Sequence, residues 1–127
     1  MAIGRLLVIG GAGFIGQHLC RAAVDRGYVV ASISLNPVAK PVPGVQYLIA
    51  NLADALSLKN TLATRQFEYV VNCGGYIDHR LFRDGGRSLI QGHFDGVQNL
   101  IECLDRGCLI RFVQLGSSDE YGDTQAP

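Results

Sequence analysis

The sequence lacks the features of a membrane protein, a secreted protein or a nucleic-acid binder. No apolar run approaches the roughly 18 to 20 residues that a helix needs to cross a bilayer, and the N-terminus lacks a signal-peptide pattern. The 11 Lys and Arg residues balance the 11 Asp and Glu residues, so no net charge attracts a polyanion or an anionic membrane. We therefore expect a cytoplasmic protein that binds neither nucleic acid nor a membrane.

The few cysteines and histidines form no metal-binding or redox pattern. Cys20, Cys73, Cys103 and Cys108 contain no C-x-x-C pair, and no histidines are paired at ligand spacing. Zinc sites and redox dithiols depend on such spacings, so neither is indicated and no metal is expected. We interpret all four cysteines as buried or half-buried small apolar residues.

The 127 residues, 48% of them hydrophobic, are enough for one domain with a substantial core. Short apolar runs predict five strands, at residues 5–9, 29–35, 45–50, 67–73 and 109–115. Helical patterns alternate with them at residues 14–26, 54–65 and 88–106, the second capped by Asp54 and the last ended by Gly107. Residues 74–86 are expected to form a loop with room for one helical turn. The alternation predicts an α/β, Rossmann-like, doubly wound parallel sheet of order 3-2-1-4-5.

A glycine-rich turn, Gly10-Gly11-Ala12-Gly13-Phe14-Ile15-Gly16, joins the first strand to the first helix. The free N–H groups and the positive dipole end of a helix N-terminus favour an anion, and glycines let the backbone approach a diphosphate. With a strand before it and a helix after it, the turn predicts a dinucleotide site at the carboxyl ends of the strands. Residues 1–127 are then a single dinucleotide-binding domain.

The end of the second strand leaves the choice between NAD and NADP open. Ser34 stands where an acidic residue usually bonds the adenosine ribose, so no carboxylate repels a 2′-phosphate. No arginine lies between Ser34 and Asn36 to hold that phosphate. The expected cofactor is NAD or NADP.

Five segments, in order along the chain, resemble the extended short-chain dehydrogenase/reductase family, the NAD-dependent epimerases and dehydratases that modify nucleotide sugars. The matching segments are the glycine turn, Asn51-Leu52-Ala53-Asp54, Val70-Val71-Asn72-Cys73-Gly74-Gly75, Gly96-Val97-Gln98-Asn99-Leu100-Ile101-Glu102 and Phe112-Val113-Gln114-Leu115-Gly116-Ser117-Ser118-Asp119-Glu120-Tyr121-Gly122. The resemblance, together with the glycine turn, assigns cofactor binding to Gly10, Gly13, Phe14, Ile15, Gly16, Ser34, Asn36, Asn51, Leu52, Cys73, Gly74 and Gly75. It also implies that Ser117, or else Ser118, is the catalytic serine that bonds the reacting sugar oxygen.

The catalytic Tyr-x-x-x-Lys of that family has no counterpart in this sequence, whose only lysines are Lys40 and Lys59. We therefore expect the N-terminal, NAD(P)-binding portion of a nucleotide-sugar epimerase, dehydratase or 4-ketoreductase, truncated before the catalytic pair and the substrate lobe and inactive alone. A nucleotide sugar would bind only with that missing part. Uncovered apolar surface on the last strand and helix then predicts a homo-oligomer or a partner chain. Two alternatives stay open: a non-catalytic dinucleotide-sensing or protein-interaction module, and a folded remnant that binds nothing.

Overall fold

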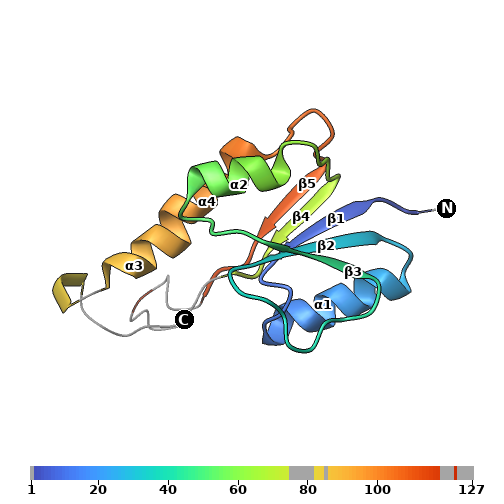
Figure 1. The fold of residues 1–127 in the computed structure, drawn as a ribbon, viewed down its shortest axis with the longest axis horizontal. Helices are drawn as coiled ribbons and strands as arrows, with labels where there is room; N and C mark the ends of the chain where they lie inside the picture. The colour runs from blue at the N-terminus through green and yellow to red at the C-terminus, as the bar shows by residue number, and fades with distance from the viewer. Residues whose placement is uncertain (1, 75–81, 85, 118–121, 123–127) are drawn as a thin grey trace, which may run out of the picture.

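A computed structural model describes residues 2–74, 82–84, 86–117 and 122, and its centre is a parallel five-stranded sheet (Figure 1). The strands are β1 (Arg5–Ile9), β2 (Val29–Ser34), β3 (Val45–Ile49), β4 (Tyr69–Asn72) and β5 (Arg111–Gln114). Their spatial order is β3-β2-β1-β4-β5, and every neighbouring pair is parallel. The predicted fold class and strand order are confirmed.

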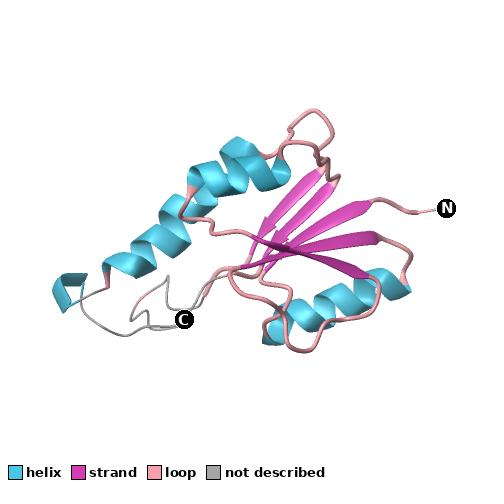
Figure 2. Ribbon diagram, in the orientation of Figure 1, coloured by secondary structure: helices cyan, strands magenta, loops and turns pink. Residues whose placement is uncertain are grey.

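Helices cover both faces of the sheet (Figure 2). They are α1 (Phe14–Asp25), α2 (Ala55–Leu62), the 3-10 turn Phe82–Asp84, α3 (Arg87–Ile90), the π-helical turn Gln91–Asp95 and α4 (Gly96–Cys103). The α1 helix lies on one face, and α2 and α4 lie on the other (Figure 1). No helix in the described ranges is both long enough and apolar enough to cross a bilayer.

Two apolar clusters, one on each face of the sheet, hold these layers together. Alternate residues of a strand point to opposite faces, and in β1 Leu7 packs toward Leu58 and Leu100 of the helical pair α2 and α4. Its neighbour Val8 packs on the other side with Cys20 of α1. A strand buried on both faces is continuously apolar, which is why the sequence reveals these strands as short unbroken runs.

The last long helix differs from its prediction. A single α-helix was expected over residues 88–106 with Gly107 as its end, but the chain passes through the π-helical turn and leaves the helix after Cys103. Leu104 is already extended, at φ −71° and ψ 139°, and its side chain belongs to the core. The apolar spacing of the helix continues to Leu104 because that side chain is buried, although its backbone is not helical.

The strands β4 and β5 are shorter than their apolar runs, which cover residues 67–73 and 109–115. Phe67 and Leu109 lie outside the strands and still pack into the core. An apolar run reports burial, whereas strand limits depend on which backbone groups pair across the ladder.

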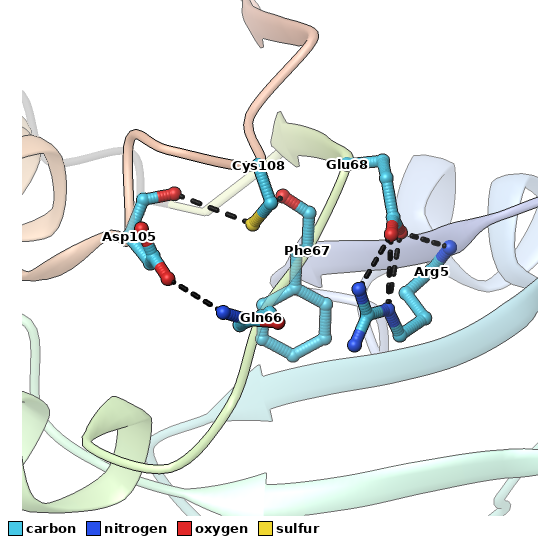
Figure 3. A network of polar contacts seen from close by, with 6 residues as sticks. All are labelled: Arg5, Gln66, Phe67, Glu68, Asp105 and Cys108. Atoms are coloured by element: carbon cyan, nitrogen blue, oxygen red, sulfur yellow. Dashed lines mark hydrogen bonds and ion pairs between the residues drawn. The ribbon is translucent and has the colours of Figure 1, made fainter.

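An ion pair fixes the amino end of the sheet. Arg5 begins β1 and binds Glu68, just before β4, through Nε and through Nη2 at 2.6 Å from Oε1, while the Arg5 amide donates to Oε2 at 2.7 Å (Figure 3). The Glu68 carbonyl accepts from the amides of Ile110 and Arg111. One residue therefore ties β1, β4 and the start of β5 together, at the end of the sheet opposite the glycine turn.

The segment before β5 is also fastened here. Gln66 donates to the Asp105 carboxylate at 2.8 Å, and the Cys108 thiol bonds the carbonyls of Phe67 and Asp105, each at 3.5 Å (Figure 3). Cys20 is buried and the other three cysteines are half-buried, as expected from the sequence.

Replacing Glu68 with Gln should reduce stability at neutral pH and make it less sensitive to acid. Hydrogen bonds from the Arg5 side chain and amide lower the pKa of the Glu68 carboxyl from 4.5 to about 2. A folded-state pKa below the unfolded value contributes stability above about pH 4.5, which is lost as the pH falls toward 2. The stability difference between the wild type and Glu68→Gln should therefore shrink across that range, as measured by urea unfolding at several pH values.

Glu102→Gln is the matched control, because it removes an exposed carboxylate on α4. It should change stability little at either end of the range. A Glu68→Gln deficit that stays constant down to pH 2 would show that the ion pair is not the origin of the effect.

Candidate functional site

A pocket of about 660 Å³ lies at the carboxyl edge of the sheet, where β1 and β4 are neighbours. Its walls come from the glycine turn, the end of β2, the segment after β3, the end of β4 and the π-helical turn. In a doubly wound sheet this edge contains the switch point, from which the chain winds in opposite directions. The fold therefore places a concave site where the glycine turn predicted one.

The glycine turn lies against the end of β4 with backbone touching backbone. Gly10 has a φ of +77°, and a Cβ there would come within 3.0 Å of the Gly74 Cα and 3.1 Å of the Cys73 carbonyl oxygen. A Cβ on Gly16 would overlap the Gly10 carbonyl group. Glycine at these positions lets the first turn of α1 approach the strand ends closely, so the helix N-terminus faces the pocket.

That helix N-terminus has no side-chain cap. Gly13 is the N-cap residue of α1, makes no side-chain cap hydrogen bond, and is followed by no acidic residue in the first turn. By contrast, Asp54 caps α2 by accepting from the amides of Leu56 and Ser57, each at 3.1 Å. The first amides of a helix need an acceptor from outside the helix. The α1 terminus is therefore suited to an anion supplied by a ligand.

The lining of the pocket carries little charge. None of the residues that line it in the described part of the chain is Asp, Glu, Lys or Arg, and the only titratable ones are Cys73 and His93. Burial raises the pKa of the Cys73 thiol, which is therefore neutral at pH 7. Negative charge in this pocket would be balanced mainly by the helix dipole and backbone amides.

The end of β2 leaves one polar atom without a partner. The amides of Gly10 and Gly11 donate to the Ile33 carbonyl at 2.9 Å and the Ser32 hydroxyl at 3.0 Å. The next hydroxyl on the same face of the strand, Ser34 Oγ, is buried and has no hydrogen-bond partner, and Ser34 lines the pocket. An unsatisfied buried hydroxyl costs about 1–3 kcal/mol.

Two side-chain amides at the other end of the pocket were missed by the sequence reasoning. Asn72, 3% exposed, donates through Nδ2 to Gln114 Oε1 at 2.9 Å and accepts from the Gly74 amide at 2.9 Å. Asn72 and Gln114 are register partners in β4 and β5, and both line the pocket. Only strand register brings residues 42 positions apart together. The sequence did contain one indication of this pair: Asn72 and Gln114 are polar residues near the ends of the apolar runs 67–73 and 109–115.

The segment after β3 forms the outer wall. Asn51 Oδ1 accepts from the Ala53 amide at 3.0 Å, and the Leu52 carbonyl accepts from Asn99 Nδ2 of α4 at 2.8 Å. Gly96 allows this approach, because a Cβ there would lie 3.1 Å from the Leu52 Cβ. The pocket wall and α4 are therefore held as one unit.

Most of the predicted cofactor-binding residues line this pocket. Those that do are Gly10, Gly13, Ser34, Asn36, Asn51, Leu52, Cys73 and Gly74. Gly16, Phe14 and Ile15 are not part of the lining. Gly16 is buried under the turn, and the side chains of Phe14 and Ile15 are 81% and 58% exposed. Of the predicted catalytic serines, Ser117 is exposed beyond the end of β5 and is not part of the lining. Gly75 and Ser118 lie outside the described residues.

Comparison with known proteins identifies the family. The sequence model of the NAD dependent epimerase/dehydratase family matches residues 6–127, nearly the whole chain. The chain belongs to this family. The resemblance found in the motifs is confirmed, and a nicotinamide dinucleotide is the cofactor class. The bare α1 terminus fits such a group.

Individual relatives match this chain over part of their own length. The chain is 28% identical to UDP-glucose 4-epimerase of Schizosaccharomyces pombe, covering 98% of this chain and 38% of that protein. It is 30% identical to dTDP-6-deoxy-L-talose 4-dehydrogenase of Kitasatospora kifunensis, covering 93% and 36%. A uronate dehydrogenase from Agrobacterium tumefaciens complexed with NAD superposes with a TM-score of 0.61 at 26% identity, covering 78% of this chain and 35% of that chain. The chain thus spans less than two fifths of these relatives.

Alanine at Gly16 should destabilise the fold far more than alanine at Gly13. At Gly16 the new Cβ overlaps the Gly10 carbonyl, whereas at Gly13 the nearest atom is the Gly10 oxygen at 3.3 Å. Overpacking of this kind costs about 1–3 kcal/mol, which outweighs the roughly 1 kcal/mol that alanine gains over glycine within a helix. Gly13→Ala should cost less than about 1 kcal/mol. Urea unfolding of the two variants measures the difference, and equal stabilities would contradict the close approach.

Proposed function

We propose that this chain is the NAD(P)-binding portion of an enzyme that epimerises, dehydrates or reduces a nucleotide sugar, and that it is inactive by itself. Both sequence relatives named above carry a nucleoside diphosphate sugar in their names. The family match and the pocket at the switch point support the same reading. In this proposal residues 1–127 form one domain, located in the cytoplasm.

The observation that carries the proposal is the uncapped N-terminus of α1 beside the pocket. Its first amides, at Phe14, Ile15 and Gly16, follow directly on Gly13, which lines the pocket and where a Cβ would meet only the Gly10 carbonyl oxygen, at 3.3 Å. The amide groups of Phe14 and Ile15, and not their exposed side chains, do the binding. The helix dipole and these donors would balance the diphosphate charge, which no lysine or arginine among the described lining residues balances.

In this proposal, the remaining predicted cofactor-binding residues contact different parts of the dinucleotide. Ser34 and Asn36 hold the adenosine ribose, Asn51 and Leu52 border the adenine, and Cys73 and Gly74, with Gly75, border the nicotinamide ribose. Asn72 fixes the 72–74 turn by binding the Gly74 amide. The backbone shape of that turn therefore depends on a side chain that itself need not touch the cofactor.

The bound nicotinamide would accept a hydride from the sugar or return one to it. The chain's own contribution to that step is a serine hydroxyl, from Ser117 or Ser118, which hydrogen-bonds the reacting sugar oxygen and is most stabilising when charge develops there. Ser117 follows β5 at the same edge of the sheet as the pocket.

Uncovered apolar side chains support a partner chain or self-association. Phe94 is 68% exposed and Ile90 47% on the long helix, and Ile110 is 65% and Val113 41% exposed at the edge strand. An open strand edge beside apolar surface is a site of further pairing. In this proposal that surface is covered in the active enzyme.

Aspartate at Gly13 should weaken dinucleotide binding at least tenfold without unfolding the protein. Gly13 has the extended backbone of an N-cap, where Asp is a favoured residue, so its carboxylate can cap α1 as Asp54 caps α2. The same carboxylate repels a diphosphate. Titration with NADH, followed by fluorescence, should show saturable binding to the wild type and binding at least tenfold weaker to Gly13→Asp, whose melting temperature should not fall.

Gly13→Asn is the matched control, since it has the same shape without the charge and should lose less affinity than Gly13→Asp. Absence of saturable binding to the wild type at millimolar NADH would overturn the proposal. Equal affinity of wild type and Gly13→Asp would remove the helix terminus as the diphosphate site.

A further inference from the structure

A closed set of hydrogen bonds joins the carboxyl ends of β4 and β5. Asn72 and Gln114 are register partners, and Asn72 Nδ2 donates to Gln114 Oε1 at 2.9 Å. The backbone makes a second link, because the Leu115 amide donates to the Asn72 carbonyl at 3.1 Å. The Gly74 amide donates to Asn72 Oδ1 at 2.9 Å, and Gln114 Nε2 donates to the Leu115 carbonyl at 3.1 Å. Each strand end is therefore bonded to the residues that follow it and to its neighbour.

The two side-chain amides can make all these bonds in only one orientation. The Gly74 amide is a donor, so it needs the oxygen of Asn72, which turns the Asn72 amino group toward Gln114. Gln114 then has to present its oxygen to Asn72 and its own amino group to the Leu115 carbonyl. Donors and acceptors thus alternate from one turn to the other. A side chain without both functions interrupts the series.

The series connects the two segments that carry the chemistry in the proposed function. Gly74 belongs to the turn predicted to border the nicotinamide ribose, and Leu115 leads to Ser117. A Cβ on Gly74 would lie 3.1 Å from Asn72 Oδ1 and 2.8 Å from Ile9 Cγ2, so the turn packs closely on the Asn72 side chain. Asn72 is 3% exposed. This burial favours an effect on a ligand through the turn that Asn72 holds over direct contact.

We propose that Asn72 and Gln114 act together as positioning residues, which hold the turn at Cys73 and Gly74 in a fixed place relative to the chain that follows β5 and contains Ser117. This inference rests on the proposed dinucleotide site. The pair keeps the nicotinamide half of the cofactor aligned with the serine segment without touching the reacting atoms. Its loss should therefore weaken binding of the nicotinamide half and leave the adenosine half unaffected.

The test compares the dissociation constants for NADH and for ADP, which has the adenosine and the diphosphate but not the nicotinamide ribose, by isothermal titration calorimetry. Gln114→Met keeps the length of the side chain and removes its hydrogen bonds, so it should weaken NADH by about threefold or more and ADP by less than about twofold. Gln114 is exposed on the edge strand, so this variant should fold. Gln66→Met is the matched control, because it removes an amide that bonds Asp105 at the opposite end of the sheet, and it should change neither constant.

Substitutions of Asn72 separate its two side-chain bonds. Serine can still accept from the Gly74 amide, as serine does in turns, but is too short to reach Gln114, whereas alanine makes neither bond. Asn72→Ala should therefore weaken NADH more than Asn72→Ser does. The double variant Asn72→Ser with Gln114→Met should bind NADH within about twofold of the weaker single variant, because both substitutions remove the same bond.

Hydrogen exchange of the Gly74 amide, measured by NMR without cofactor, reports on the pair directly. In Gln114→Met its rate should rise by about threefold or more, because Asn72 loses the partner that orients it. The Cys73 amide donates to the Ile9 carbonyl at 2.9 Å and should keep its rate.

Three results would each overturn the inference and leave the dinucleotide site standing: an unchanged NADH affinity of Gln114→Met, equal weakening of NADH and ADP, or additive losses in the double variant. Absence of saturable NADH binding to the wild type would overturn the inference and the proposed function together. Because Gln114→Met is decisive in itself, an Asn72 variant that fails to fold does not leave the question open.

Discussion

The close approach of the glycine turn to the ends of the strands is the constraint on which the rest of this structure depends. Gly10 and Gly74 meet with no room for a Cβ between them, and Gly16 brings α1 down onto the Gly10 carbonyl. With a side chain at either point, the helix would stand away from the sheet and its first amides away from the switch point. The pocket, its electrostatics and its fit to a diphosphate all follow from that contact.

The two ends of the sheet are held in different ways. At the amino end, the ion pair between the side chains of Glu68 and Arg5 joins the strands. The Glu68 carbonyl also accepts from the amides at the start of β5. At the carboxyl end, backbone groups and neutral side chains replace charges, as in the Asn72–Gln114 pair. Among the described residues, this division leaves the lining of the pocket without a charged Asp, Glu, Lys or Arg. The helix dipole is therefore the dominant local field acting on a negatively charged ligand there.

Specific residues show how far prediction from sequence extends into the site. Gly10, Ser34, Asn51 and Cys73 could be identified because each lies within the last two positions of an apolar run or directly after one, and parallel strands end at a common edge. Gln114 could not, since its place in the wall depends on its register with Asn72. The side chains of Phe14 and Ile15 are a related case. The sequence predicts both residues at the cofactor site, but only the structure shows that their side chains are exposed and that neither residue lines the pocket.

The sequence by itself determined the strand order, the position of the glycine turn and the family, because burial on both faces and backbone close approach restrict residue types at every such position. It did not determine where α4 ends or where β4 and β5 begin. Nor did it determine that the Ser32 hydroxyl binds the Gly11 amide while Ser34 lines the pocket. Those features depend on which groups separated in sequence meet in space. Two identical residues on β2 differ in whether the hydroxyl has a hydrogen-bond partner in the chain, and only the tertiary structure decides this.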